Sequence, residues 1–149
     1  MNQLLIFQAN ALFDETLPKI SNISNLLALC FYEYKEINWI GLYYTNYQNK
    51  ECTLGPFQGK VACTRIPFNR GVIGACINSS KTIRVDDVHQ FKNHIACDGE
   101  TNSELVIPLY NENKEILAVL DIDSLVFNYF DNDKTETFES IASVFTKLL

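Results

Sequence analysis

Apolar positions three or four residues apart mark one face of a helix in two long segments of the chain. The first segment begins at Ser21, and its apolar face consists of Ile23, Leu26, Leu27, Cys30, Phe31 and Tyr34. The second runs from Asp133 to Leu149, and its face consists of Phe138, Ile141, Ala142, Phe145 and Leu148. A further short helix is expected over residues 1–13, before a break over 14–18. Cys30 lies on an apolar face, so we interpret it as a core residue.

Between these helices the chain has the β-branched and aromatic runs that are typical of strands. Strands are expected over residues 37–44, 51–59, 61–68 and 82–88, with the second broken at Gly55–Pro56. A short helix carrying Cys76 is expected over 69–81, and a polar loop over 89–102. Residues 104–110 and 115–124 are predicted to form a hairpin around the turn 111–114. The pattern predicts one α+β domain over residues 1–149, with a mostly antiparallel central sheet flanked by the N- and C-terminal helices.

The composition suits a soluble globular protein and narrows its partners. Of the 149 residues, 47% are hydrophobic and 20% are charged, and the net charge is -6. Such an acidic chain argues against nucleic acid and against an anionic membrane surface as partners. The N-terminus lacks the basic start of a signal peptide, and no segment reaches the ~18 apolar residues of a membrane helix. A cytoplasmic location is therefore expected, with a monomer and a homodimer both left open.

The five cysteines, Cys30, Cys52, Cys63, Cys76 and Cys97, are odd in number and widely spaced. In a chain expected to be cytoplasmic, this does not indicate a disulfide framework. There is no CxxC pair, and His94 three residues before Cys97 is a weak metal signal by itself, so no metal site is expected. The residues alone leave three roles open for Cys97: a structural thiol, a metal ligand, or a nucleophile beside acids.

Three carboxylates are expected to gather at the open end of the predicted hairpin. Along a strand, side chains alternate between faces, so Asp121 and Asp123 share one face and lie roughly 7 Å apart. If Tyr110 pairs with Glu115, Glu104 falls directly opposite Asp121. Like charges placed opposite each other destabilise a sheet unless a cation or a shared proton compensates. The alternative is an ordinary solvated strand end, and a one-residue slip would send Glu104 to the other face.

Several longer motifs carry a family resemblance. They are LGPFQGKVAC (54–63), RIPF and GVIG within 65–74, DVHQFKNHIACD (87–98), NSE (102–104) and VLDIDS (119–124). In this order they resemble the free methionine-(R)-sulfoxide reductases, which are single GAF-domain enzymes that act on the free amino acid. The match extends from about Asn38 to Ser124, well over half of the chain. The resemblance implies a GAF fold and an oxidoreductase that reduces free L-methionine-(R)-sulfoxide.

The resemblance also implies roles for individual residues. Cys97 matches the catalytic cysteine, and Cys63 matches a cysteine that forms a disulfide with it. Trp39 matches an aromatic residue at the methyl end of the substrate. The acids Glu104, Asp121 and Asp123 match those that line the substrate pocket, and Glu104 or Asp123 is expected to protonate the sulfoxide oxygen. Thioredoxin is the implied external reductant, and no metal or organic cofactor is expected.

One position departs from the family pattern. The family commonly has cysteine at the third position of GVCG, where this chain has Ile73. Cys76 follows three residues later, but on a helix it points in another direction, so its role in redox chemistry stays open. Cys52 matches nothing in the motifs and is interpreted as structural.

Two alternative functions remain. The chain could be a non-catalytic GAF module that senses a small ligand, because a fold does not fix a function. Against this, three acids would repel the phosphate of a cyclic nucleotide. The other alternative is a family member that binds methionine sulfoxide but turns it over poorly, which Ile73 suggests.

Overall fold

The computed structural model describes residues 1–95 and 97–149; Ala96, within the HIACD motif and the predicted loop 89–102, lies outside the described residues. The described part of the chain forms a six-stranded sheet and four α-helices. The helices are α1 (Gln3–Ala11), α2 (Lys19–Glu33), α3 (Gly71–Ser79) and α4 (Asn132–Thr146). The strands are β1 (Ile37–Asn46), β2 (Glu51–Gly59), β3 (Arg65–Pro67), β4 (Ile83–Val85), β5 (Ser103–Tyr110) and β6 (Ile116–Ser124).

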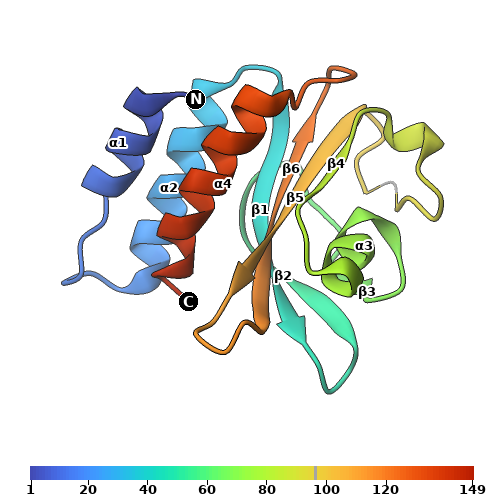
Figure 1. Ribbon diagram of the computed structural model, residues 1–149, viewed down its shortest axis with the longest axis horizontal. Helices are drawn as coiled ribbons and strands as arrows, with labels where there is room; N and C mark the ends of the chain where they lie inside the picture. The colour runs from blue at the N-terminus through green and yellow to red at the C-terminus, as the bar shows by residue number, and fades with distance from the viewer. Residues whose placement is uncertain (96) are drawn as a thin grey trace.

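The sheet has the order β3-β2-β1-β6-β5-β4, and every neighbouring pair is antiparallel. Helices α2 and α4 cover one face, with α1 packed against them on the side away from the sheet, and α3 lies on the other face with the loops around it (Figure 1). This arrangement confirms the α+β class, the antiparallel sheet and the terminal helices that the sequence predicts. Among the described residues, no helix combines the length and apolar character needed to cross a membrane.

Each face of the sheet has its own hydrophobic core. Leu105, Leu120 and Ile122 point toward α2 and α4, whose apolar faces include the fully buried Cys30, and α1 extends this core from the outer side of the two helices. Val106 and Val119, one residue out of phase, belong to the second core with α3. Strand alternation therefore separates a large core from a smaller one. The acids and Trp39 lie on the side of the smaller core.

Three predicted elements differ from the structure. Gly55–Pro56 does not break β2; the strand continues through an irregular register opposite Gly41–Tyr43. In the predicted strand 61–68 only Arg65–Pro67 is a strand, because Gly59 takes a positive φ of 132° and the chain leaves the sheet there. The predicted strand 82–88 is confined to Ile83–Val85. A 3-10 turn (Val88–Gln90) follows it, capped by the Asp87 side chain, which accepts from the His89 N–H.

Candidate active site

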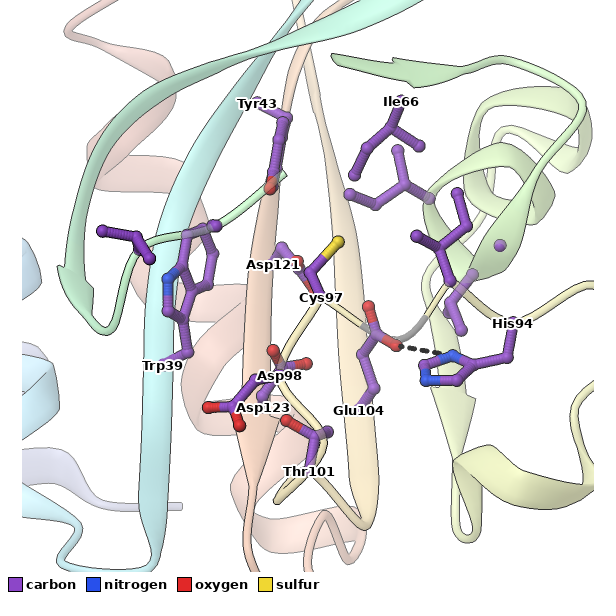
Figure 2. A pocket seen from close by; sticks show the side chains of 16 residues that line it. Trp39, Tyr43, Ile66, His94, Cys97, Asp98, Thr101, Glu104, Asp121 and Asp123 are labelled. Carbon is purple, nitrogen blue, oxygen red and sulfur yellow. Dashed lines mark ion pairs between the residues drawn. The ribbon is translucent and has the colours of Figure 1, made fainter. Parts of the chain in front are cut away.

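A pocket opens on the α3 side of the sheet, between β1, β5 and β6 below and two loops above. It contains about 530 Å³ of empty space, its open mouth included. Its floor comes from Trp39, Tyr43, Glu104, Asp121 and Asp123, and its walls from residues of α3 and of the loops around Val61 and Cys97 (Figure 2). The described residues that line it include all of the predicted site residues except Cys63, which lies at its edge.

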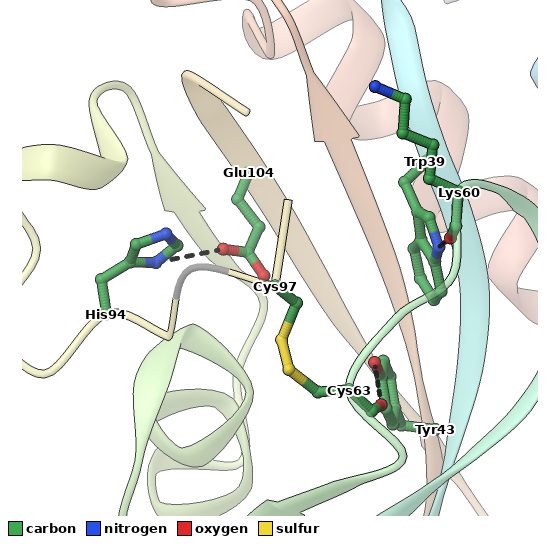
Figure 3. Close-up of a disulfide and its surroundings, with 7 residues drawn as sticks. All are labelled: Trp39, Tyr43, Lys60, Cys63, His94, Cys97 and Glu104. Atoms are coloured by element: carbon green, nitrogen blue, oxygen red, sulfur yellow. Dashed lines mark hydrogen bonds and ion pairs between the residues drawn. A yellow bond between two sulfur atoms is a disulfide. The ribbon is translucent and has the colours of Figure 1, made fainter. Parts of the chain in front are cut away.

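A disulfide joins Cys63 to Cys97 and ties the two loops together over the pocket (Figure 3). Their Cα atoms lie 5.6 Å apart, the ordinary spacing for a disulfide. The bond joins the two cysteines for which the resemblance implies a pairing. Both residues are half-buried, so an external reductant has partial access to the bond.

The register of the β5–β6 hairpin corrects the prediction by two residues. Glu104 lies opposite Asp123 rather than Asp121, and Asp121 lies opposite Val106. The difference arises near the turn, where an irregularity after Leu109 pairs Tyr110 with Ile116 instead of Glu115. Because strand side chains alternate with a period of two, this even shift leaves all three acids on the same face.

The three carboxylates form one cluster inside the pocket. One oxygen from each of Glu104, Asp121 and Asp123 lies within 4.8 Å of the others, close enough for all three to share one cation. Glu104 and Asp121 are only 7% and 6% exposed, and Asp123 is half-buried. One oxygen of Asp121, Oδ1, is buried and has no hydrogen-bond partner within the described structure. Such an oxygen is suited to accept from a donor on a ligand.

Burial and mutual repulsion keep protons in this cluster. Burial, then the charges of Asp121 and Asp123, raises the pKa of Glu104 well above its usual range. Burial raises the pKa of Asp121 to about 6, although its contact with Glu104 pulls the other way. Burial, then the charge of Asp121, also raises the pKa of Asp123. All three carboxyl groups therefore hold protons more tightly than ordinary side-chain acids do, and the cluster can supply a proton to a bound ligand.

Trp39 lies flat against the sheet in a slot that two glycines create. A Cβ on Gly41 would come within 2.5 Å of the indole ring, and a Cβ on Gly59 within 2.6 Å of it. The ring stacks on Phe57 and Tyr43, with centroid distances of 5.3 and 5.8 Å. Trp39 also pairs with Asp123 across the β1–β6 ladder, which places an apolar wall directly beside the acids.

The structure adds residues to the site that the sequence analysis did not select. His94 lies with its Nδ1 3.9 Å from the Glu104 carboxylate, and burial lowers the pKa of its imidazole. Asn38 donates to both Asp98 and Thr101 at 3.0 Å, which anchors the Cys97 loop to β1. Tyr43 donates its hydroxyl to the Cys63 carbonyl at 2.8 Å. A sequence signal existed for Tyr43, because it follows Trp39 by four residues on the same strand, and for His94, because it lies three residues before Cys97.

The remaining cysteines lie outside the pocket. Cys30, Cys52 and Cys76 are free and fully buried, and burial raises the pKa of each thiol to about 12. On α3, Ile73 lines the pocket, whereas Cys76 is not among the described residues that do. Three residues apart on α3, both side chains belong to the second core, so Cys76 lies on nearly the same helix face as Ile73, about one turn further along. The expectation that Cys76 points in another direction is therefore wrong.

Comparisons with known proteins agree with this geometry. The family model described as "GAF domain" matches residues 9–147. The chain is 40% identical to the "Free methionine-R-sulfoxide reductase" of Escherichia coli, over 94% of this chain and 83% of that protein. It is 39% identical to the protein of the same name from Saccharomyces cerevisiae, over 96% and 82% of the two chains.

A solved structure is similar over nearly the whole chain. It is that of the free methionine-R-sulfoxide reductase from Neisseria meningitidis in complex with its substrate. The TM-score is 0.89 at 34% identity, covering 97% of this chain and 85% of that one. The chain therefore belongs to the GAF domain family and, within it, to the family of the free methionine-R-sulfoxide reductases.

Proposed function

We propose that this protein reduces free L-methionine-(R)-sulfoxide to L-methionine, using Cys97 as the nucleophile and Cys63 as the resolving thiol. The observation that carries the proposal is the Cys63–Cys97 disulfide at the edge of a pocket that contains an aromatic wall and a proton-holding carboxylate cluster. Relatives at about 40% identity that carry the name of this activity support it.

The pocket offers complementary surfaces to the two ends of the substrate. The Trp39 ring, backed by Phe57, is an apolar surface for the methyl group on the sulfur. The carboxylates supply negative charge for the ammonium group, and the unpartnered Asp121 oxygen is an acceptor for one of its N–H groups. An ammonium bound here also offsets the carboxylate charge that would otherwise oppose ionisation of the Cys97 thiol.

The first chemical step transfers the oxygen atom of the sulfoxide to Cys97. The Cys97 thiolate attacks the sulfoxide sulfur while Glu104 gives its proton to the oxygen, which weakens the bond between that oxygen and the sulfur. The protonated oxygen then moves to the Cys97 sulfur, as its bond to the substrate sulfur and the transient bond between the two sulfurs break. The thioether methionine leaves, and Cys97 becomes a sulfenic acid. Glu104 is the donor in this account because it is more buried than Asp123.

The second step closes the disulfide. The Cys63 thiol attacks the sulfenic sulfur of Cys97, and the oxygen leaves as water. Two electrons have then passed from the two thiols to the substrate. Thioredoxin, or another external dithiol, returns the pair to the reduced state by thiol–disulfide exchange. The cycle requires two thiols, an acid and an external dithiol, and neither a metal nor an organic cofactor takes part in it.

The proposal is tested with thioredoxin-coupled NADPH oxidation, using the (R) and (S) epimers of free methionine sulfoxide in parallel. Turnover is expected on the (R) epimer alone. Cys97→Ser should abolish it, Cys63→Ser should reduce it strongly, and Cys76→Ser should leave it near the wild-type rate. If the fully reduced wild-type protein turns over neither epimer but binds one of them, it is instead a non-catalytic GAF binding module.

A further inference from the structure

The loop that carries Cys63 is held by side chains of β1. The Trp39 Nε1–H donates to the Lys60 carbonyl at 3.1 Å, and the Tyr43 hydroxyl donates to the Cys63 carbonyl at 2.8 Å (Figure 3). Just beyond Cys63, the Leu54 N–H donates to the Thr64 carbonyl at 3.0 Å. The loop is therefore fixed on both sides of Cys63 by other groups, and Tyr43 holds Cys63 itself.

Besides these bonds, the middle of this loop is held by the packing of Ala62 and Cys63 against the second core. Val61 is 88% exposed, and Lys60 makes its ion pair with Glu100 at the surface, where both side chains are more than half exposed. Surface ion pairs of this kind contribute little. The part-buried hydrogen bond from Tyr43 is the one that acts directly on the main chain of Cys63.

The Tyr43 hydroxyl donates to the loop, although Tyr43 lines the same pocket as three carboxylates that could accept its proton. Tyr43 is 2% exposed and lines the pocket together with the three acids. Burial, then the charges of Asp121 and Asp123, raises the pKa of its phenol, so the hydroxyl keeps its proton across the working pH range. Because that proton is shared with the Cys63 carbonyl, it is not directed at the sulfoxide oxygen.

We propose that the Tyr43 hydroxyl is a positioning group for the resolving step, in which it holds Cys63 within bonding reach of Cys97. In this step Cys97–SOH and Cys63–SH react to give the Cys63–Cys97 disulfide and water. In this structure the two Cα atoms lie 5.6 Å apart, the ordinary spacing for the bond, and the Tyr43 hydroxyl holds the Cys63 carbonyl in that loop position. This role rests on the cysteine cycle of the proposed function, and it gives a residue outside the thiol pair a part in the second step of that cycle.

Tyr43→Phe tests the proposal, because it deletes the hydroxyl and keeps the aromatic stack. Reduced enzyme is mixed with one equivalent of (R)-sulfoxide, quenched over time with acid and an alkylating agent, and assayed for methionine and for the disulfide. Disulfide formation is expected to slow roughly five- to tenfold relative to methionine formation, the effect of losing one hydrogen bond to a carbonyl. Dimedone should then trap Cys97 sulfenic acid that wild type does not accumulate.

Tyr47→Phe is the matched control. The Tyr47 hydroxyl also donates to a main-chain carbonyl, that of Ile116 at 2.9 Å, but at the far end of β1 from the cysteine loops. Tyr47→Phe should form the Cys63–Cys97 disulfide at the same rate as wild type. The proposal is overturned if Tyr43→Phe forms the disulfide as fast as Tyr47→Phe, or if methionine formation slows as much as disulfide formation, which would place the hydroxyl in the first step.

Two further measurements distinguish a failure of the Tyr43 role from a failure of the proposed function. In a Cys63→Ser background, Tyr43→Phe should leave the sulfenic acid lifetime unaltered, because the thiol to be positioned is gone. Hydrogen peroxide can also oxidise Cys97 to the sulfenic acid without any sulfoxide. If wild type forms the disulfide with peroxide but releases no methionine from the sulfoxide, the proposed function fails. The comparison of Tyr43→Phe with Tyr47→Phe then still decides the role of Tyr43.

Discussion

Replacing Asp121 with Asn is expected to stabilise the protein at neutral pH while it damages the substrate site. In the folded state Asp121 has a pKa of about 6, compared with an ordinary value of 3.8. The folded protein therefore binds this proton more tightly than the unfolded chain does. Stability from Asp121 is fully present below pH 3.8 and is lost as the pH rises to about 6.

The size of the effect follows from the two pKa values. A change from 3.8 to about 6 corresponds to about 3 kcal/mol of unfolding free energy lost at pH 7. Asp121 is 6% exposed, so solvent screens this cost only weakly. Asn is uncharged at every pH, and its amide can donate to Glu104. At ~2–4 °C per kcal/mol for a chain of this size, Asp121→Asn should raise the Tm by roughly 6–12 °C at pH 7.

Urea denaturation of the reduced protein between pH 3.5 and pH 8 measures this difference. Wild type should lose stability across the interval from about pH 4 to 6, whereas Asp121→Asn should show a flatter profile. Asp86→Asn is the control, because the Asp86 side chain is 55% exposed at the end of β4. If Asp121→Asn is no more stable than wild type at pH 7 and its stability changes with pH in parallel with wild type, ionisation of the buried Asp121 carboxylate does not lower the stability of the folded protein.

Three other predictions concern the cysteines and the tryptophan slot. The disulfide joins residues 34 positions apart, so its reduction should lower the free energy of unfolding by about 4 kcal/mol. Urea titrations with and without reductant measure this difference, and equal stability of the two forms would contradict the prediction. Gly59→Ala should lower the free energy of unfolding by ~1–3 kcal/mol, because Gly59 has a φ of 132° and the new Cβ would meet the Trp39 ring. Gly99→Ala is the control and should lower it less, because a Cβ on Gly99 would have nothing within 4 Å. Cys76→Ala should lower the free energy of unfolding by about 1 kcal/mol, because it leaves a small cavity. The variant should still form the Cys63–Cys97 disulfide on oxidation, which thiol counting by mass spectrometry can check.

Sequence periodicity predicts much of this fold because it depends on local rules. The alternation along β6 places Asp121 and Asp123 on one face without knowledge of the partner strand. The partner residue of Glu104 was predicted wrongly, because an irregularity next to the turn moves the register by two residues. The three acids still gather, since an even shift preserves the face.

The Cys63 loop shows where such reasoning fails. Residues 61–68 have the composition of a strand, but only Arg65–Pro67 joins the sheet. The rest leaves the sheet after Gly59 and is held by hydrogen bonds from Trp39 and Tyr43. These bonds join residues about 20 positions apart, and no local pattern encodes them. His94 was likewise weighed only as a metal ligand, because its place beside Glu104 depends on how the loop folds back over β5.

The central claim is that one sulfoxide molecule is reduced at the expense of the Cys63 and Cys97 thiols. The most direct test mixes the fully reduced protein with one equivalent of free methionine-(R)-sulfoxide, without any reductant, and measures methionine and free thiols together. One methionine per chain is expected, with the loss of two thiols and a disulfide that peptide mapping locates at Cys63–Cys97, and the (S) epimer should not react. Methionine formation without loss of these thiols, or no methionine at all, would contradict it.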